Sequence, residues 1–469
     1  MTRHLRPRDL ISKHLYFGVL SPIRGNTRRP LKRFQNKWDL LHAPRPAIEQ
    51  AQTARLLDLL SHCFQRVPFY RERLLRAGIR RESDFRPEAL ANLPPLGKED
   101  IQDNFDSLLS EAVPRSDWVE NSSGGSTGNP VNLVQDRNYR EEALATSWVS
   151  DLMQGWRFGH RRALLWGSPK DVGLLSELKW RSSRYLHNEN LYDSFDMGVP
   201  RMESFHRDLN RFRPDVMIAY SSSACLLAQF LSERGLRPGY PSTSIISSAE
   251  TLTEAMRASI AGCFGVPVYD RYGTREAGTV ASECEKHCGL HLHMLDHYLE
   301  VVDFETGRPV WDRPGRILVT LLTNYAMPLV RYDIGDVGVL TREPCPCGRN
   351  TLVLKQLLGR VSDFITSPAG RLVHGEYFTH AFYGHRGIRQ FQFVQETRAQ
   401  YTVRIVKAAD FNPADIADIK EEILAVLGRE ADLRFEFPEA IAPTASGKFR
   451  FTISNVPVSF AAQTYESTS

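Results

Sequence analysis

Between residues 118 and 340, short apolar segments alternate with helical ones, and this alternation constrains the fold more than any other feature. The segments 162–168 and 215–220 are candidates for short buried strands, whereas 138–154 has the apolar spacing of a helix. Strands and helices that interleave along a chain pack as layers. The sequence therefore predicts an α/β fold for this region.

The flanking segments have other patterns. Residues 47–78 repeat apolar side chains at helical spacing, and Pro68 should divide them into two helices. After Gly289 the pattern changes to hairpins, with turn signals at 305–307 and 314–315. We therefore expect a helical opening and a β-rich part that follows the α/β layers.

The last hundred or so residues predict a separate α+β unit. Strands are expected at 391–395 and 401–407, and a helix at 412–428. Asn412 is expected as the N-cap of this helix and Gly428 as its stop. One face of the helix is apolar, through Ile416, Ile419, Ile423 and Leu427.

Charge is unevenly distributed along the chain. The 469 residues carry a formal net charge of +4, but residues 1–33 hold nine Lys or Arg and one acid, Asp9, so residues 34–469 sum to about −4. A nucleic-acid protein normally carries a basic surface on its folded body, so we expect no nucleic-acid partner. A hydrophobic content of 42% in this length predicts a globular protein of two or three domains.

The basic N-terminus does not have the pattern of an export signal. The apolar run 15–20 is interrupted by Ser21 and Pro22, and no small-residue cleavage site follows. No stretch approaches the roughly 18 apolar residues of a membrane span. We therefore expect a cytoplasmic protein whose residues 1–33 dock on an acidic partner or peripherally at the inner membrane surface.

Seven cysteines are too few for a disulfide framework in a chain of this length, and four of them form two short clusters. Cys284 and Cys288 lie among several histidines, and Cys345 and Cys347 follow some fifty residues later. Separated clusters of sulfur and imidazole ligands can form a four-coordinate zinc site. The alternative is a set of reduced thiols without metal.

The loop SSGGSTGNP, residues 122–130, is rich in glycine and hydroxyl groups. Glycines let backbone N–H groups approach an anion, and the hydroxyls add donors, so the loop suits a polyphosphate. It does not have the Walker spacing, because Asn129 and Pro130 stand where that motif needs Gly and Lys. Taken alone, the loop is also compatible with a polar hairpin turn.

Two further segments combine an aromatic or acidic side chain with glycine. In RYGTREAG, residues 271–278, Tyr272 can stack on a purine and Glu276 can hold Mg²⁺ against phosphate oxygens. In RYDIGD, residues 331–336, Asp336 can accept hydrogen bonds from ribose hydroxyls. Each segment alone has a plain alternative, a solvated charge or a turn.

A single lysine completes this group of candidates. Lys448 lies in PTASGKFR, residues 443–450, on a glycine-containing loop near the C-terminus. Such a lysine can reach a phosphate or carboxylate oxygen if its domain moves inward. The alternative is a surface lysine in a loose tail.

The order of these motifs along the chain strengthens the functional interpretation of each of them. SSGGSTG, YGTRE, RYDIGD, LGRVSDFI and PTASGK together resemble the core motifs of the acyl-adenylate-forming superfamily, which includes acyl-CoA synthetases, adenylation domains and luciferases. The segments LLDLLSHCFQRVPFYRERL and LPPLGKEDIQDNF, with the cysteine clusters, are most similar to the phenylacetate-CoA ligase family and its capsular-polysaccharide relatives. The resemblance covers residues 47–451.

The resemblance implies a domain organisation. It implies a layered α/β N-terminal domain with a β-rich subdomain, joined by a hinge to a small α+β C-terminal domain. With the basic leader, this predicts a leader at 1–46, an ATP- and acyl-binding domain at 47–359, and a mobile domain at 360–469 that carries the catalytic lysine.

The resemblance also implies a role for each motif. The nucleotide-binding residues would be Ser122, Ser123, Gly124, Gly125, Ser126, Thr127, Gly128, Tyr272, Gly273, Thr274, Asp336 and Arg360. The catalytic residues would be Lys448 and Glu276, the latter also holding magnesium. The acyl pocket would include Tyr220, Ser221, Ser248 and Ala249, and zinc would be bound by Cys284, His291, Cys345 and Cys347, with His287 or Cys288 as alternatives to His291.

The implied reaction makes an acyl-adenylate from a carboxylic acid and ATP, and then transfers the acyl group to CoA after the C-terminal domain rotates about its hinge. An alternative acceptor is a carrier-protein thiol, an amine or a sugar hydroxyl in polysaccharide or natural-product assembly. A non-enzyme alternative is a zinc-stabilised binding protein. A homodimer is left open.

Three positions differ from the family pattern. Ser362 occupies the hinge position where relatives usually have Asp or Lys. Arg275 replaces a small hydroxyl residue, and Arg271 replaces a smaller polar or acidic residue near the adenine amino group. Adenylation is therefore the firmer part of the prediction, and hinge movement and acceptor choice depend on these changes.

Overall fold

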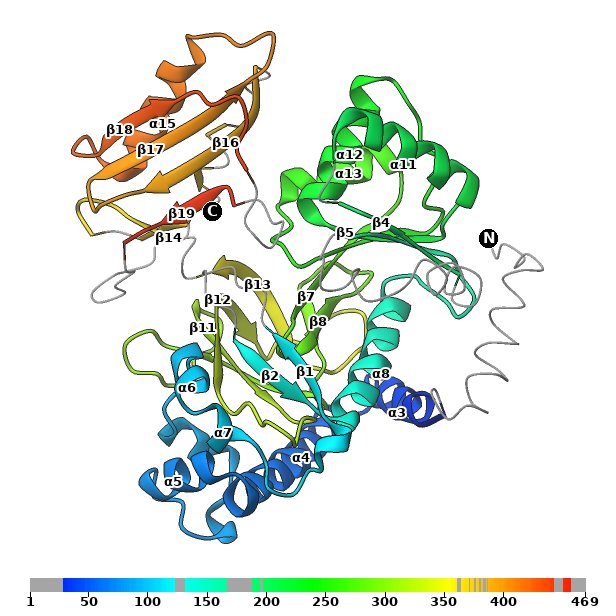
Figure 1. Ribbon diagram of the computed structural model, residues 1–469, viewed down its shortest axis with the longest axis vertical. Helices are drawn as coiled ribbons and strands as arrows, with labels where there is room; N and C mark the ends of the chain where they lie inside the picture. Colours follow the sequence, from blue (N-terminus) through cyan, green and yellow to red (C-terminus); the bar gives the residue numbers. More distant parts are fainter. Residues whose placement is uncertain are drawn as a thin grey trace. The chain divides into compact units, whose positions relative to one another are not determined.

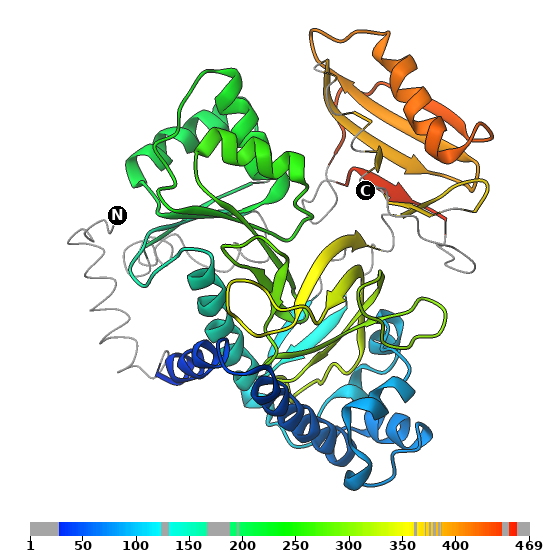
Figure 2. The same ribbon diagram turned by 180° about the vertical axis from the view of Figure 1, so that it is seen from behind.

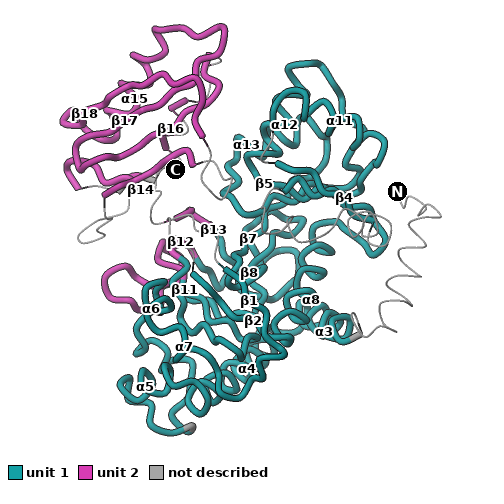
Figure 3. The backbone as a smooth tube through the Cα atoms, in the orientation of Figure 1, with its two compact units in different colours: residues 1–300, 318–334, 340–356 teal, residues 301–317, 335–339, 357–469 magenta. Residues whose placement is uncertain are grey.

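The computed structural model describes most of the chain, which divides into two compact units (Figure 3). Unit 1 comprises residues 1–300, 318–334 and 340–356, and unit 2 comprises 301–317, 335–339 and 357–469. The described residues are 28–122, 131–166, 188–194, 197–360, 364–370, 372–374, 377–378, 381–382, 385, 387–442 and 450–456. The domain boundaries expected at residues 46 and 359 stay predictions.

The opening of unit 1 is helical, as its apolar spacing predicts. Helix α4 (Arg45–Arg66) buries Leu56 and Leu59 on one face, and Pro68 begins α5 (Pro68–Arg76). Between them, Val67 is extended, with φ −126° and ψ 103°. A residue before proline is pushed out of the helical region, and proline at the first helical position loses no hydrogen bond. The helix break predicted at Pro68 is confirmed.

Helix α3 (Arg28–Leu40) precedes α4 and packs against α8 (Arg137–Met153). Phe34 of α3 belongs to the same buried cluster as Trp148 and Trp156, and its ring meets that of Trp148 edge-on at 6.4 Å. Asp136 begins α8 as the N-cap, and its side chain accepts a hydrogen bond from the Tyr139 amide at 2.7 Å. The later part of the basic leader is therefore part of the core.

Short helical turns occupy the segment between α5 and the first hairpin. They are η2 (Glu82–Asp84), η3 (Pro87–Asn92), α6 (Lys98–Asp103), α7 (Phe105–Leu108) and η4 (Arg115–Asp117). The hairpin consists of β1 (Val119–Ser122) and β2 (Asn132–Gln135), which are antiparallel and pair Ser122 with Asn132. It brings together the two ends of the glycine-rich loop.

Within the described residues, eleven strands form one sheet in the order β10-β11-β12-β13-β9-β8-β7-β6-β5-β3-β4. The bounds are β3 (Arg162–Leu165), β4 (Glu189–Tyr192), β5 (Val216–Tyr220), β6 (Ser244–Ser248), β7 (Val268–Thr274), β8 (Gly278–Glu283), β9 (Leu290–Leu292), β10 (His297–Val302), β11 (Gly315–Leu321), β12 (Tyr332–Thr341) and β13 (Val353–Arg360). Strands β4, β3, β5, β6 and β7 are parallel, whereas β7, β8, β9 and β13 pair antiparallel. The predicted α/β fold is confirmed.

Helices cover both faces of the parallel strands. Figures 1 and 2 show α11 (Val199–Phe212), α12 (Ser221–Glu233) and α13 (Glu254–Phe264) on one side of β3 to β6, and α8 with α3 on the other. Val216 and Ile218 of β5 belong to the cluster under α3 and α8, as the alternation of a strand requires. Within the described ranges, no helix is long and apolar enough to cross a membrane.

The C-terminal part of unit 2 is a small α+β body. Its sheet has the order β18-β17-β16-β19, and β14 pairs with β15. The bounds are β14 (Phe364–Thr366), β15 (Leu372–His374), β16 (Ile388–Gln395), β17 (Gln400–Lys407), α15 (Asp415–Leu427), β18 (Asp432–Glu436) and β19 (Thr452–Ser454). Ile419, Ile423 and Leu427 of α15 pack into the core of this body, which confirms the predicted apolar face.

The start of α15 differs from the prediction. Ala414 is the N-cap, so the helix begins at Asp415, three residues after Asn412. The Asn412 side chain instead accepts a hydrogen bond from the Ala414 amide at 3.1 Å and forms a turn ahead of the helix. Gly428 follows the last helical residue, with φ 94°, as expected of a stop.

Candidate active site

The candidate site in unit 1 lies at the carboxyl ends of adjacent parallel strands. Tyr220 is the last residue of β5, Ser248 the last of β6, and Tyr272 and Thr274 lie in the last three residues of β7. These strands are hydrogen-bonded neighbours, with Tyr220 opposite Ser248 and Ser248 opposite Arg271. Open α/β sheets bind ligands outside this edge, so the fold brings the predicted adenine and acyl residues together.

The turn after Tyr272 is built for a close backbone approach. A Cβ on Gly273 would lie 2.7 Å from the carbonyl oxygen of Gly278, closer than real contacts allow, so only glycine fits. The Thr274 hydroxyl accepts a hydrogen bond from the Ala277 amide at 3.0 Å and closes the turn. Tyr272 itself is 5% exposed.

Glu276 lies within this turn, and its side chain is largely buried. Burial, with the nearby charges of Asp296 and Glu276, raises the pKa of the Tyr139 phenol. Tyr139 also lies against the turn, since a Cβ on Gly278 would be 3.0 Å from its hydroxyl. The Glu276 carboxylate fits the predicted magnesium role, because Mg²⁺ is usually held by one or two carboxylates and the substrate phosphates.

The predicted ribose residues lie together in unit 2. Arg360, the last residue of β13, has its Nε 3.6 Å from a carboxylate oxygen of Asp336 on β12. Gly335, just before Asp336, has φ 84°, a conformation that favours glycine. The two residues lie on consecutive strands, β12 and β13, which are neighbours in the sheet and bring the two side chains together.

Several predicted residues lie outside the described residues. They are the phosphate loop from Ser123 to Gly128, Lys448 and the hinge residue Ser362. Ser122 is described at the end of β1, where its amide donates to the Asn121 side chain at 2.8 Å. The roles of these residues stay predictions.

The acyl-pocket candidates form a hydroxyl-rich edge beside two aromatic rings. The Ser221 and Ser247 hydroxyls are 2.6 Å apart, and the Ser248 hydroxyl donates to the Arg271 carbonyl at 3.4 Å. The ring of Tyr220 lies 4.3 Å from that of Trp166, at 40°. Ala249 has φ 70°, so the chain turns sharply as it leaves β6.

Sequence reasoning missed Trp166 and Glu250 in this region. Trp166 follows β3 directly, whereas the predicted strand 162–168 included it as a strand residue. The Glu250 carboxylate accepts a hydrogen bond from the Ser222 amide at 2.9 Å, in the first turn of α12. A carboxylate is favourable there because helix N-termini carry positive partial charge.

Arg271, which departs from the family pattern, is directed toward α8. Its guanidinium donates to Asp151 at 2.9 Å, and Asp151 also accepts from Arg162 at 2.8 Å. The charge of Arg271 is therefore balanced inside unit 1. This pairing explains how the position accommodates a large cation.

The predicted zinc ligands come together as a buried cluster. Ligand atoms of Cys284, His291, Cys345 and Cys347 all lie within 4.8 Å of one another. The Cys284 and Cys345 sulfurs are 3.7 Å apart, and Nε2 of His291 is 3.3 Å from the Cys347 sulfur. Three thiols and one imidazole are a standard donor set for structural zinc, so these residues fit the metal.

Neighbouring groups orient the cluster. Nδ1 of His291 lies 3.0 Å from the Thr351 hydroxyl, so Nε2 faces the sulfurs. Burial, helped by the charge of Arg349, lowers the pKa of His291 to about 4 and keeps the ring in its neutral, ligating form. The Arg349 amide donates to the Cys347 sulfur at 3.4 Å.

The two alternative ligands lie elsewhere. The Cys288 side chain is exposed and faces the Lys286 carbonyl. His287 lies 3.1 Å from Glu283 and stacks on Tyr269. Among the described residues, His291 is therefore the histidine that completes the cluster.

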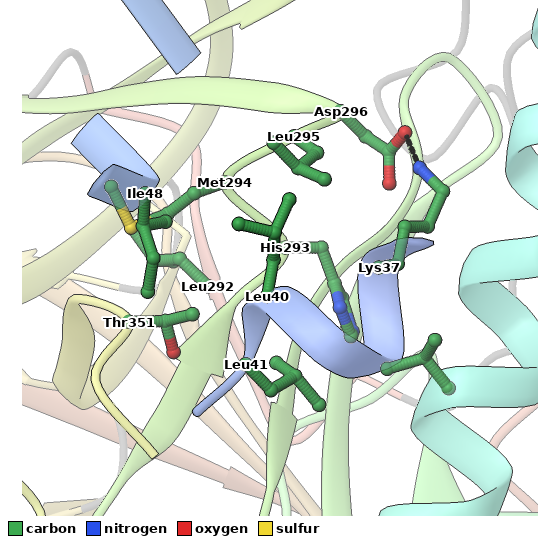
Figure 4. Close-up of a pocket in the computed structure, with 11 residues that line it drawn as sticks. Lys37, Leu40, Leu41, Ile48, Leu292, His293, Met294, Leu295, Asp296 and Thr351 are labelled. Carbon is green, nitrogen blue, oxygen red and sulfur yellow. Dashed lines mark hydrogen bonds and ion pairs between the residues drawn. The ribbon is translucent and has the colours of Figure 1, made fainter. Parts of the chain in front are cut away.

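A second buried network, which the sequence did not indicate, connects α3 to the sheet. Lys37 is 6% exposed and forms ion pairs with Asp296 and with Glu142. Figure 4 shows Lys37 and Asp296 joined beside His293, at a small cavity that Leu40 and Thr351 help to line. At about 20 Å³ the cavity has room for one water molecule.

The fold is that of the adenylate-forming acyl-CoA ligases. A solved structure of 2-hydroxyisobutyryl-CoA ligase bound to an adenylate superposes with a TM-score of 0.72 at 21% identity, covering 88% of this chain and 91% of that one. Residues 365–455 match the family model of the CapK C-terminal domain.

Two sequence relatives give the family. The phenylacetate-coenzyme A ligase of Thermus thermophilus is 31% identical over 337 residues, covering 69% of this chain and 72% of the relative. Protein CapK of Staphylococcus aureus is 24% identical, covering 78% of this chain and 80% of the relative. The chain belongs to the phenylacetate-coenzyme A ligase family, which confirms the resemblance expected from the motifs.

Proposed function

We propose that this protein is an ATP-dependent, AMP-forming ligase that joins a carboxylic acid to coenzyme A. The observation that carries the proposal is the position of Tyr272 to Glu276 at the carboxyl end of a parallel strand, in a member of the phenylacetate-coenzyme A ligase family. Ligands of open α/β sheets bind at this edge. The solved relative named above, an acyl-CoA ligase, supports the same activity.

In the first half-reaction, the substrate carboxylate attacks the α-phosphorus of ATP. A carboxylate-to-phosphorus bond forms, the bond to the β-phosphate breaks, and pyrophosphate leaves with the electron pair. Tyr272 would lie against adenine, Asp336 and Arg360 would hold the ribose, and Ser122 to Gly128 would contact the β- and γ-phosphates. Lys448 would stabilise the charge that develops between the carboxylate and the α-phosphate.

In the second half-reaction, the CoA thiol loses its proton and attacks the acyl carbonyl, and AMP leaves. The C-terminal domain would rotate between the two steps and withdraw Lys448, so that one small domain serves both. Ser362 would lie at this hinge. The acyl group would be held near Tyr220, Ser221, Ser248 and Ala249.

Two metal ions fit the side chains present. Magnesium, when bound with ATP, neutralises phosphate charge, and Glu276 would hold it. Zinc would be held by Cys284, His291, Cys345 and Cys347 and would pin the β8–β9 hairpin to the loop before β13, a structural role. The zinc ligands all belong to unit 1, and the proposed reaction does not pass through them.

A second candidate keeps the adenylation and changes the acceptor. The CapK relative and the CapK C-terminal match at 365–455 favour it, because the proposed mechanism admits the acceptor by rotating this domain. The acceptor would then be a carrier-protein thiol, an amine or a sugar hydroxyl.

We also propose a cytoplasmic location, where ATP and CoA are available, with residues 1–33 contacting an acidic partner or the inner membrane surface. Arg29 and Arg33 form ion pairs with Glu141 of α8, so part of this basic charge is already used within the chain. A measurement of the protein's mass in solution would decide whether it forms a homodimer.

The test is carboxylate-dependent exchange of labelled pyrophosphate into ATP. The wild type should catalyse exchange with at least one acid from an aromatic and aliphatic panel, and Lys448→Ala should lose it. Lys420→Ala, an exposed lysine of α15 in the same body, is the matched control and should exchange normally. Failure of the wild type with every acid would remove both enzyme proposals.

The acceptor is tested with the acid that supports exchange. CoA, a carrier protein, an amine and a sugar are each added, and the acylated product is identified by mass. A CoA thioester supports the main proposal, and acylation of another acceptor without any CoA thioester supports the second.

A further inference from the structure

We infer that Lys37 is a positioning residue for the turn that carries Glu276, and that α3 therefore belongs to the framework of the nucleotide site. The inference rests on the proposed magnesium role of Glu276. None of the motifs that carry the resemblance lies in α3. The connection is made by side chains that only the folded chain brings together.

The first link is a buried ion pair from α3 to the β9–β10 turn. The Lys37 ammonium forms an ion pair with Asp296 (Figure 4). It also lies 2.7 Å from a Glu142 oxygen. Asp296, 3% exposed, also accepts a hydrogen bond from the Thr146 hydroxyl. Lys37 thus fixes Asp296 against α8, away from water.

The second link runs from Asp296 to the Glu276 turn. His297 follows Asp296 in the chain, and its Nε2 donates to the Ala277 carbonyl at 2.8 Å. Burial lowers the pKa of His297, so the neutral ring has one proton to donate. Its Nδ1 also lies 3.3 Å from the His293 carbonyl oxygen, and the proton is assigned to Nε2 because the Ala277 contact is shorter. Ala277 is the residue after Glu276, and a shift of His297 therefore moves the turn directly.

Two further residues, from β2 and α8, contact the same turn. Gln135 donates to the Arg275 carbonyl at 3.2 Å. Tyr139, one turn before Glu142 on α8, lies against Gly278. The turn from Thr274 to Gly278 is therefore supported by α8 and by the segment around His297, and Lys37 bridges these two supports.

Removing the lysine charge should disturb this arrangement. Asp296 and Glu142 would remain as buried carboxylates facing each other across the vacated ammonium. Glu142 would keep its ion pairs with Arg33 and with Arg55, whose guanidinium lies 3.4 Å from a Glu142 oxygen. Asp296 would keep the hydrogen bond from the neutral Thr146 hydroxyl. A buried charge that loses its partner strongly destabilises the local structure that holds it. We therefore expect Asp296, and His297 with it, to move.

The test variant is Lys37→Met, which removes the charge and keeps most of the side-chain volume. Arg33→Gln is the matched control, because it removes a cation from the same helix and the same Glu142 without touching Asp296. Lys37→Arg tests rescue by a retained charge. The double variant Lys37→Met/Asp296→Asn also removes the carboxylate that would be left without its partner. It is used if the single variant does not fold.

Two readouts do not depend on turnover. Hydrogen exchange of peptides covering residues 274–283 reports the order of the turn. Calorimetric binding of a non-hydrolysable ATP analogue over a magnesium series reports the metal affinity. Glu276→Gln is measured in parallel, so that the role of Glu276 is tested separately from that of Lys37.

For Lys37→Met we expect faster exchange at 274–283 and an increase of about tenfold in the magnesium concentration needed for analogue binding. Arg33→Gln should match the wild type, and Lys37→Arg should recover at least part of the loss. Unchanged exchange and unchanged magnesium dependence in Lys37→Met, and in the double variant, overturn the inference. If Glu276→Gln leaves the magnesium dependence unchanged while Lys37→Met speeds exchange, Lys37 still positions the turn, and it is the proposed role of Glu276 that fails.

Discussion

Gln392 on β16 anchors the backbone that follows the predicted catalytic lysine. Its side-chain amide donates to the Arg450 carbonyl at 3.0 Å and accepts from the Arg404 guanidinium at 3.0 Å. Gln392 is 6% exposed, so water competes poorly for these bonds. Arg450 lies two residues after Lys448, and β19, which begins at Thr452, pairs with β16. We predict that Gln392→Met slows adenylation by loosening the base of the lysine loop.

The magnitude follows from the bonds removed. Of the two bonds, the one to the Arg450 carbonyl reaches the segment that follows Lys448, and a neutral hydrogen bond contributes roughly 0.5 to 1.5 kcal/mol net. If this energy holds the loop in its productive position, pyrophosphate exchange should fall about twofold to twelvefold. Arg404 keeps its ion pair with Glu436, at 3.3 Å, which limits the damage to β17 and β18.

The assay separates the two half-reactions. In the proposed mechanism, pyrophosphate exchange would use Lys448, whereas thioester formation from a supplied acyl-adenylate and CoA would not. Gln392→Met should therefore slow the first and leave the second near wild type, and Glu436→Gln, which leaves both bonds of Gln392 in place, is the control. An equal loss in both half-reactions, or no loss of exchange in a folded variant, would refute the reasoning.

Three further predictions concern metal, pH and nucleotide. Cys345→Ser should lower bound zinc from about one equivalent to well below one and should lower the Tm, as metal analysis and thermal unfolding would show; a wild type without zinc contradicts the site. Burial, with the charge of Glu283, raises the pKa of Asp270 to about 7, whereas the unfolded carboxyl ionises near pH 4, so stability should decline between these values as the pH rises. Asp270→Asn should accordingly raise the Tm more at pH 8 than at pH 5, and a gain that is the same at both pH values speaks against this origin. Asp336→Asn should raise the KM for ATP about tenfold, because a charged acceptor for the ribose is lost, and should leave the KM for the acid unchanged; a change in the acid KM alone would place Asp336 elsewhere.

Sequence patterns predicted helices and their buried faces well where neighbouring residues alone determine them. Pro68 divides two helices because its ring cannot continue α4, whatever surrounds it. Ile419, Ile423 and Leu427 recur on one face of α15 and are buried there, as the period of a helix requires. The N-cap of α15 was predicted two residues too early, at Asn412 instead of Ala414, since the Asn412 side chain can cap a turn as well as a helix.

The site was predicted less completely, because most of its contacts join distant residues. Motif order suggested that Asp336 and Arg360 share the ribose, and the ion pair between them supports that grouping. Nothing local in the sequence singled out Trp166, which reaches Tyr220 only because β3 and β5 are neighbours in the sheet. Which strands become neighbours in a sheet depends on how the whole chain packs, and a single sequence gives little information about it.

The sequence by itself determined the α/β class, the helical opening, the separate C-terminal α+β body and, through its motifs, the family. These depend on periodicity and on residue types that a short segment carries alone. Tertiary structure decided which cysteines and histidine meet, with His291 rather than His287 or Cys288 beside Cys284. It also decided that Lys37, in the predicted leader 1–46, is buried against Asp296. Cys284 and Cys345 are 61 residues apart and Lys37 and Asp296 are 259 residues apart, so no local pattern predicts these contacts. The pairing of β9 with β13 and the packing of α3 on α8 bring these side chains within contact distance.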